Sequence, residues 1–341
     1  MRVGRVDLHQ SVLQGDRLAL ARLLTEIEND SAAGQQALND LFKHTGKAHL
    51  VGVTGAPGTG KSSLVNQLAL HYRQPTNGRR RVAVVAVDPT SPFTGGAVLG
   101  DRVRMRELSG DDGVFIRSMA TRGSLGGLAA ATAGLVQALD AAGYELIFIE
   151  TVGAGQTEVD IAKLAHTTLV VNVPGLGDDV QAIKAGILEI ADIMVLNKAD
   201  RPGVEAAERA LLGMLKLGHP TKRIIRHHGQ AMTVEAGDAG VAAADEWIPP
   251  IRRTVAIDGK GILELAEAIA GHRLHLEKTG GWILRDRARL ESEVETLLQS
   301  SLMSRWRESV NDKKYQAMLE QLLARKLSPR QAVNALLNGD T

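Results

Sequence analysis

Hydrophobic positions along the chain alternate between short β-branched runs and longer segments with helical spacing. The short runs predict strands over residues 49–54, 81–88, 113–118, 144–150, 168–173, 193–197 and 251–257. Helical patterns separate these runs, and that alternation is typical of an α/β fold with a mostly parallel central sheet flanked by helices. Ligands of such folds bind at the carboxyl ends of the strands, so we expect the chemistry of this protein there.

Both ends of the chain predict helices outside the sheet. Near the N-terminus, Asp16 is an N-cap candidate, and apolar side chains follow at helical spacing at Leu20, Leu23, Leu24 and Ile27. Near the C-terminus, one apolar stripe runs from Leu290 to Leu302 and another from Tyr315 to Leu323. We therefore expect three parts, which are a helical N-terminal extension, a central α/β domain and a helical C-terminal arm, over residues 1–47, 48–271 and 272–341.

The stripes of the C-terminal arm need a partner surface. They pack either on the protein's own core or on a second copy, and because symmetric dimers are common we favour a homodimer.

Composition narrows the function classes. The 341 residues are 44% hydrophobic but only 3% aromatic, so the core is expected to be aliphatic. Forty basic residues balance 39 acidic ones without a basic run, which argues against nucleic acid as a partner. The absence of cysteine excludes disulfides, thiol catalysis and thiolate metal sites. No apolar stretch approaches the roughly 20 residues of a membrane span, and the first residues lack a signal-peptide core. We expect a cytoplasmic protein that does not contact membranes.

The strongest motif is GAPGTGKS at residues 55–62, which directly follows the first predicted strand. It fits the pattern G-x-x-x-x-G-K-[ST], whose backbone N–H groups wrap a polyphosphate. Lys61 is expected to reach the β- and γ-phosphates, and the Ser62 hydroxyl to ligate Mg²⁺. Gly58 and Gly60 lack the Cβ that would block close backbone approach. The predicted phosphate-binding residues are Gly55, Ala56, Pro57, Gly58, Thr59, Gly60, Lys61, Ser62 and Ser63.

Carboxylates follow two later strands. Glu150 and Gly153 fit the acid that reaches Mg²⁺ in P-loop hydrolases and the glycine that contacts the γ-phosphate. Asp88 is expected to hold Mg²⁺ through water or to orient the attacking water, and the alternative is a turn that it forms with the next residues. Gln156 is a water-orienting candidate, with a structural role as an equal alternative. The catalytic candidates are Lys61, Asp88, Glu150 and Gly153.

The tetrapeptide NKAD at residues 197–200 follows another predicted strand and selects the base. The Asp200 carboxylate can accept hydrogen bonds from guanine N1–H and the 2-amino group, and adenine offers neither donor. The Lys198 stem is expected to cover the ring, and Asn197 to tie this loop to the phosphate loop. G proteins hold guanine with a further Ser-Ala turn, where this chain has Val255-Ala256, so we expect only a backbone contact from Ala256 or Ile257. The ligand is predicted to be GTP or GDP.

Taken together, these motifs resemble one family. They are the phosphate loop, DPTSP at 88–92, GDRVRM at 100–105, RSMATRGSLGGLA at 117–129, ETVGAGQTE at 150–158 and NKAD at 197–200. The chain resembles the methylmalonyl-CoA mutase-associated GTPases, also called ArgK- or MeaB-like, over nearly its whole length. These proteins are chaperones of adenosylcobalamin-dependent acyl-CoA mutases.

The resemblance implies a homodimeric P-loop GTPase that gates the loading of adenosylcobalamin into a partner mutase. It implies that Asp88, Asp101 and Glu150 surround the Mg²⁺ held by Ser62, with Asp101 in a first switch. Residues 153–156 would belong to a second switch and residues 178–184 to a third that relays the nucleotide state to the mutase. Adenosylcobalamin would be met only through that mutase. The segment 218–250 is longer than expected for the family, so isobutyryl- or 2-hydroxyisobutyryl-CoA mutases are open as partners.

Two other function classes share the core motifs. A metal-delivery GTPase of the hydrogenase or urease maturation type would be expected to carry cysteines or clustered histidines, and His227-His228 lack a third ligand nearby. A P-loop kinase is suggested by the ArgK label, but the NKAD tetrapeptide does not favour an ATP-dependent enzyme.

Overall fold

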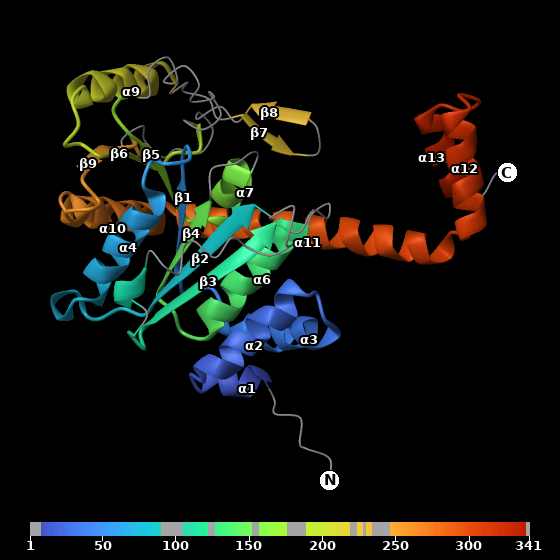
Figure 1. The fold of residues 1–341 in the computed structure, drawn as a ribbon, viewed down its shortest axis with the longest axis horizontal. Helices are drawn as coiled ribbons and strands as arrows, with labels where there is room; N and C mark the ends of the chain where they lie inside the picture. The colour runs from blue at the N-terminus through green and yellow to red at the C-terminus, as the bar shows by residue number, and fades with distance from the viewer. Residues whose placement is uncertain are drawn as a thin grey trace, which may run out of the picture. The chain divides into compact units, whose positions relative to one another are not determined.

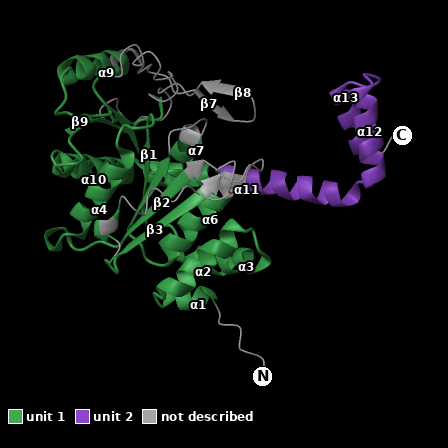
Figure 2. Ribbon diagram, viewed as in Figure 1, with its two compact units in different colours: residues 1–291 green, residues 292–341 purple. Residues whose placement is uncertain are grey.

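The computed structural model describes residues 8–89, 105–108, 110–121, 127–151, 157–175, 189–218, 224–227, 230–233 and 246–338. The chain forms two compact units, residues 1–291 and 292–341 (Figure 2). Across the described ranges, none of the helices combines the length and the apolar character that crossing a bilayer requires.

A seven-stranded sheet is the centre of the first unit (Figure 1). Every neighbouring pair of strands is parallel, in the order β3-β2-β4-β1-β5-β6-β9. The strands are β1 (His49–Thr54), β2 (Val82–Pro89), β3 (Val114–Thr121), β4 (Leu146–Thr151), β5 (Thr167–Asn172), β6 (Ile193–Asn197) and β9 (Ile251–Thr254). Because all the pairs are parallel, the motif-bearing ends of β1, β4 and β6 share one edge of the sheet.

Helices cover both faces of the sheet. One face carries α4 (Lys61–Arg73) and α10 (Ile262–Thr279), which share a core with Val51, Val53 and Phe148. The other carries α6 (Gly127–Ala141), α7 (Thr157–Leu164) and, over β5 and β6, α9 (Val204–Gly218). Alternate residues of each strand supply the two cores, as expected for strands buried on both sides.

Three N-terminal helices extend this second layer: α1 (Leu8–Leu13), α2 (Arg17–Glu28) and α3 (Ala32–Leu41). Asp16 caps α2 by accepting hydrogen bonds from the N–H groups of Leu18 and Ala19, which confirms the predicted cap. Arg117 of β3 forms a bidentate ion pair with Glu28 of α2. This arginine, which opens the RSMATRGSLGGLA motif, therefore anchors α2 to β3.

Beyond the sheet, α11 (Gly281–Ser309) crosses from the first unit into the second. The second unit also contains α12 (Asp312–Leu323) and α13 (Pro329–Asn338). Ser328 and Gln331 form a capping box at the start of α13, since the Ser328 N–H donates to Gln331 Oε1 and the Gln331 N–H to Ser328 Oγ. Within this unit the ring of Trp306 meets that of Tyr315 edge to face.

The predicted fold class is confirmed, and the differences are local. The last strand ends at Thr254 rather than at residue 257, because a turn begins there: the Val255 N–H donates to Lys260 O, and the Asp258 N–H to Val255 O. In the excursion between β6 and β9, an antiparallel pair forms from β7 (Ile224–His227) and β8 (Gln230–Thr233). The three-part domain division stays a prediction.

Candidate functional site

The predicted phosphate loop joins β1 to α4 at the carboxyl edge of the sheet. A Cβ at Gly55 would lie 2.2 Å from the carbonyl oxygen of Val171, and one at Gly60 would lie 2.5 Å from Asn197 Nδ2. Both positions therefore need glycine. Gly58 has open space on its side-chain face, so its φ of +76° rather than a close approach within the protein explains the glycine there.

Lys61 is the first residue of α4, and its side chain is buried within the loop. Its Nζ donates hydrogen bonds to the carbonyl oxygens of Gly55 at 2.9 Å and Ala56 at 3.1 Å. These neutral acceptors lie in the same loop whose amides would wrap a phosphate, at the positive end of the α4 dipole. An incoming phosphate oxygen is a stronger, charged acceptor for this ammonium group than a carbonyl oxygen.

Ser62 and Glu150 meet although 88 positions separate them in the sequence. The Ser62 hydroxyl donates to Glu150 Oε1 at 2.6 Å, and both residues are buried. A hydroxyl and a carboxylate side by side, next to a loop that can hold phosphates, form an oxygen-only donor set of the kind that Mg²⁺ takes. The residues present therefore fit a magnesium ion.

Asn197 connects three loops at this edge. Its Nδ2 donates to the carbonyl oxygen of Thr59 at 2.8 Å. Its Oδ1 accepts from Thr254 Oγ1 and from the Ala256 N–H, each at 3.1 Å. The carboxamide is buried, so this one side chain fixes the phosphate loop, the end of β6 and the turn after β9 relative to one another.

The predicted base-binding residues border the same loop. Lys198 has a left-handed backbone, with a φ of +55°, and its Nζ donates to the carbonyl oxygen of Gly58 at 2.7 Å. Asp200 is exposed. Because the Ala256 N–H is bonded to Asn197, it is not the donor that guanine would meet, and Ile257 becomes the better of the two candidates for a backbone contact.

Several predicted residues lie outside the described part of the chain. These are Asp101, Gly153, Gln156 and the segment 178–184. Asp88 is placed by its backbone only, near the end of β2 and opposite Ala120 of β3. Their proposed roles stay predictions.

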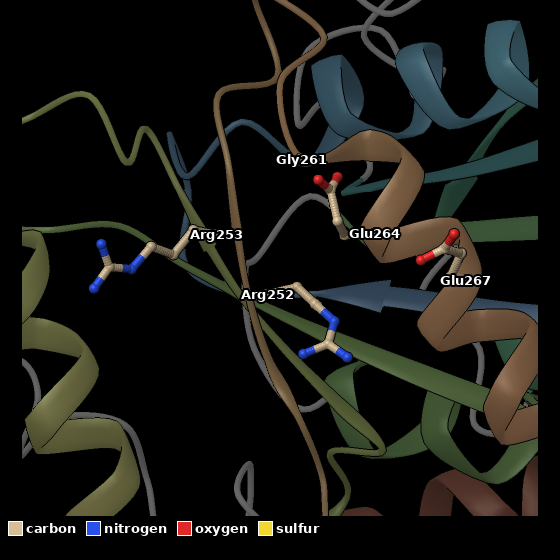
Figure 3. A pocket seen from close by; sticks show the side chains of 5 residues that line it. All are labelled: Arg252, Arg253, Gly261, Glu264 and Glu267. Atoms are coloured by element: carbon tan, nitrogen blue, oxygen red, sulfur yellow. The ribbon is translucent and has the colours of Figure 1, made fainter.

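A cavity of about 480 Å³ opens elsewhere, beside β9 and the start of α10 (Figure 3). It is lined by Arg252, Arg253, Gly261, Glu264 and Glu267. Arg253 is engaged with Glu208 of α9, and the side chains of Arg252 and Arg253 point to different sides of the strand (Figure 3). None of the predicted phosphate- or base-binding residues lines it, so this cavity is not the nucleotide site.

One functional contact was missed from the sequence. The Thr254 hydroxyl donates a hydrogen bond to Asn197 Oδ1. The one sequence signal for this contact is that Thr254 directly precedes the turn expected to contact the base. In the described ranges, no group of three or more histidine or acidic residues is arranged to hold a metal ion.

The chain is similar to one family of GTPases over most of its length. The family model described as Methylmalonyl Co-A mutase-associated GTPase MeaB matches residues 20–311. A "Putative GTPase" of Pyrococcus abyssi is 44% identical over 331 residues, covering 97% of this chain and 95% of that protein. GTPase ArgK of Escherichia coli is 34% identical over 271 residues, covering 78% of this chain and 75% of its own.

A more distant relative and one solved structure extend the comparison. The mitochondrial Methylmalonic aciduria type A homolog of Caenorhabditis elegans is 30% identical over 279 residues, covering 77% of this chain and 64% of that protein. The crystal structure of a LAO/AO transport system kinase superposes with a TM-score of 0.67 at 24% identity, covering 97% of this chain and 95% of that one. This last likeness shows a shared fold.

Proposed function

Because the chain belongs to the family of methylmalonyl-CoA mutase-associated GTPases, we propose that it binds GTP and Mg²⁺ at the carboxyl edge of the sheet and reports its nucleotide state to an acyl-CoA mutase. The observation that carries the proposal is the Asn197 carboxamide, which bonds the phosphate loop and the turn after β9 at once. A nucleotide with its phosphates in the phosphate loop and its base beside the turn after β9 would connect the same two segments.

The residues divide the work by their chemistry. Lys61 would exchange its carbonyl partners for β- and γ-phosphate oxygens, and Asp200 would accept from guanine N1–H and the 2-amino group. Ser62 and Glu150 would hold Mg²⁺, with Asp88 and Asp101 as further candidates, and the ion would neutralise charge on the phosphates. GTPases that lack an arginine finger turn over slowly, at roughly 10⁻⁴ to 10⁻² s⁻¹, so we expect a low basal rate.

The proposed partner is an adenosylcobalamin-dependent acyl-CoA mutase. Support comes from the family's description and from the name of the nematode relative. Hydrolysis would reset the segments that follow β4 and β5, residues 153–156 and 178–184, and the mutase would read them while it receives or releases its cofactor. Adenosylcobalamin would then be handled through the mutase, and we expect both proteins in the cytoplasm.

A homodimer is proposed for the second unit. Three apolar side chains of α11 lie on one stripe and are exposed within the chain, Val294, Leu298 and Leu302. Replacing Leu298 and Leu302 by Glu should convert a dimer into a monomer in light scattering, while Ser300→Lys, on the side of the same helix opposite Leu298, should not. A wild-type protein that is monomeric at micromolar concentration would contradict this part of the proposal.

The decisive experiment measures GTP turnover with and without candidate mutases. We expect slow Mg²⁺-dependent hydrolysis that one mutase accelerates, and retention of that mutase by the immobilised protein in the GTP state. Equal hydrolysis of ATP and GTP, with no response to methylmalonyl-, isobutyryl- or 2-hydroxyisobutyryl-CoA mutase, would contradict the proposal.

A further inference from the structure

Asn66 is a buried polar residue on the helix that begins with the phosphate-binding lysine. It lies one helical turn after Ser62 on α4, and only 7% of its surface is exposed. Its Oδ1 atom is buried and has no hydrogen-bond partner in the part of the chain that the structure describes. A buried acceptor without a hydrogen bond destabilises the folded state, so its presence calls for an explanation.

Helix geometry directs this side chain toward the proposed metal position. Residues i and i+4 share one face of a helix, and side chains lean toward the helix N-terminus. Ser62 is itself bonded to Glu150 of β4, so the face that Ser62 and Asn66 share looks onto the sheet at that point. The carboxamide of Asn66 therefore lies on the sheet side of α4, beneath the Ser62–Glu150 pair.

Strand register shows that the sheet beneath leaves room for polar groups. Ala86 of β2 pairs with Glu150 on one side and with Ser118 of β3 on the other, so the three residues form one row on the same face. The middle member has only a methyl side chain. Ser118 Oγ is also buried without a hydrogen-bond partner among the described residues. Asn66 Oδ1 and Ser118 Oγ are thus two buried polar atoms without hydrogen-bond partners among the described residues, in the layer next to the proposed metal position.

We propose that Asn66 Oδ1 accepts a hydrogen bond from a water molecule of the magnesium ion held by Ser62 and Glu150, which makes Asn66 a positioning residue for the metal. Mg²⁺ dehydrates reluctantly and keeps several waters, so donors are available one shell beyond the protein ligands. Acceptors in that outer shell orient the inner ligands and contribute to metal affinity. The inference rests on the proposed function, because it needs the nucleotide and its metal at this edge.

The test is the isosteric variant Asn66→Leu, with magnesium affinity measured on the protein–GDP complex by fluorescence of an N-methylanthraniloyl nucleotide. We expect the magnesium concentration for half-maximal response to rise about 10- to 100-fold, and nucleotide affinity in EDTA to stay unchanged. The thermal midpoint without ligand should hold or rise, because an unsatisfied buried oxygen is removed. Asn66→Asp, which keeps the acceptor, should restore tight magnesium binding.

Tyr144 supplies the matched control. Its hydroxyl is also buried without a partner among the described residues, but it precedes β4 at the opposite end of the strand from Glu150. Tyr144→Phe should change stability alone. If Asn66→Leu likewise changes stability and leaves the magnesium dependence intact, the proposal is overturned.

A structural water between Asn66 and Ser118 is the competing explanation. In that case Ser118→Ala and Asn66→Leu would shift stability together and neither would change magnesium affinity, which also overturns the proposal. Failure of the wild-type protein to bind any guanine nucleotide, in contrast, would refute the proposed function itself. The two failures are therefore distinguishable.

Discussion

The two ends of the central sheet use polar residues in opposite ways. At the carboxyl edge, Lys61 and Lys198 donate to neutral backbone carbonyl oxygens, and a phosphate can replace the two partners of Lys61. At the amino edge, charged groups are paired with charged groups. Asp192 receives a bidentate pair of hydrogen bonds from Arg285 and lies 3.3 Å from His272 Nε2, while its Oδ2 also accepts from the Thr168 N–H.

A second part of the amino-edge network is built around His166. Its Nδ1 accepts from the Leu50 N–H at 3.1 Å, which fixes the tautomer, and its Nε2 then donates to Asp286 Oδ1 at 2.9 Å. The ring stacks on Trp282 with centroids 3.8 Å apart. These contacts hold the start of α11 against β1 and β5 within the first unit.

Three groups of this network have shifted pKa values. Burial, and next the charge of His166, lowers the pKa of His49 well below its usual value. Burial also lowers the pKa of His166, against the opposing effect of Asp286. Burial raises the pKa of Asp286, but its hydrogen bonds to His166 and Arg289 outweigh that effect and leave the pKa lowered. Perturbed pKa values often mark functional sites, but these three belong to a network of structural contacts at the amino edge.

The largest expected effect is at the carboxyl edge. Lys61→Ala removes the ammonium group that we propose to meet the β- and γ-phosphates, so GTP turnover should fall at least about 100-fold. Lys278→Ala, at the exposed end of α10, is the control and should keep full turnover. Malachite-green phosphate release measures both, and a Lys61→Ala protein with more than a tenth of wild-type activity would argue against this assignment.

The next effect belongs to the amino edge. Arg285→Leu leaves the buried Asp192 without its bidentate partner, and we expect the free energy of unfolding to drop by about 3 kcal/mol. Arg287→Leu, which removes an exposed i,i+4 pair with Glu291, should leave the free energy of unfolding nearly unchanged. Urea unfolding compares the two variants. If the folded Arg285→Leu protein loses GTP affinity, the amino edge is not purely structural, and the proposed difference between the two edges of the sheet is contradicted.

Base selectivity comes third. Asp200→Asn replaces an acceptor by an amide donor that suits the 2-oxo group of xanthine, so the preference for GTP over XTP should reverse by about 100-fold or more. Asp258→Asn, on the neighbouring turn, should leave the preference unchanged. Competition binding with both nucleotides gives the ratio. Unaltered GTP selectivity in the Asp200 variant would remove this residue from the site.

The smallest effect is the pH dependence of stability. The folded pKa values of His49 and His166 lie below the unfolded value of about 6.5, so unfolding takes up protons below that pH. Stability is then present above pH 6.5 and is lost as the pH falls toward the folded pKa values, by at most about 1.4 kcal/mol per pH unit for each proton. His166→Gln should flatten this slope and His44→Gln should not. Thermal unfolding between pH 7.5 and 5 measures the slope for the wild type and both variants. An equal slope in all three proteins would contradict the role of the network.

The sequence was sufficient for much of the sheet, because its strands are continuous apolar runs with sharp ends. The bounds of β1 and β6 match the predicted 49–54 and 193–197. The end of β9 was missed, because a turn closed by backbone hydrogen bonds leaves no apolar signature. Motif spacing also located the phosphate loop and the NKAD segment, because the side chains expected to bind the ligand are contiguous in each motif.

Other features depend on register between distant segments, which periodicity does not encode. The link from Asn197 to Ala256 arises only once β9 lies on β6. The row of Glu150, Ala86 and Ser118 needs β2 between β4 and β3. The histidine network was equally invisible. Its members lie in four separate segments, at residues 49, 166, 192 and 272–289, and meet only at the amino edge of the folded sheet.

The central claim is that a guanine nucleotide binds at the carboxyl edge through the loop from Gly55 to Ser62. Isothermal titration calorimetry with Mg²⁺ tests it most directly, using GTP, GDP and ATP on wild-type protein and on Lys61→Ala. The account predicts one site per chain for GTP and GDP, at least about 100-fold weaker binding of ATP, and loss of GTP binding in the variant. Absence of heat with GTP on folded protein, or equal affinity for ATP, would contradict it.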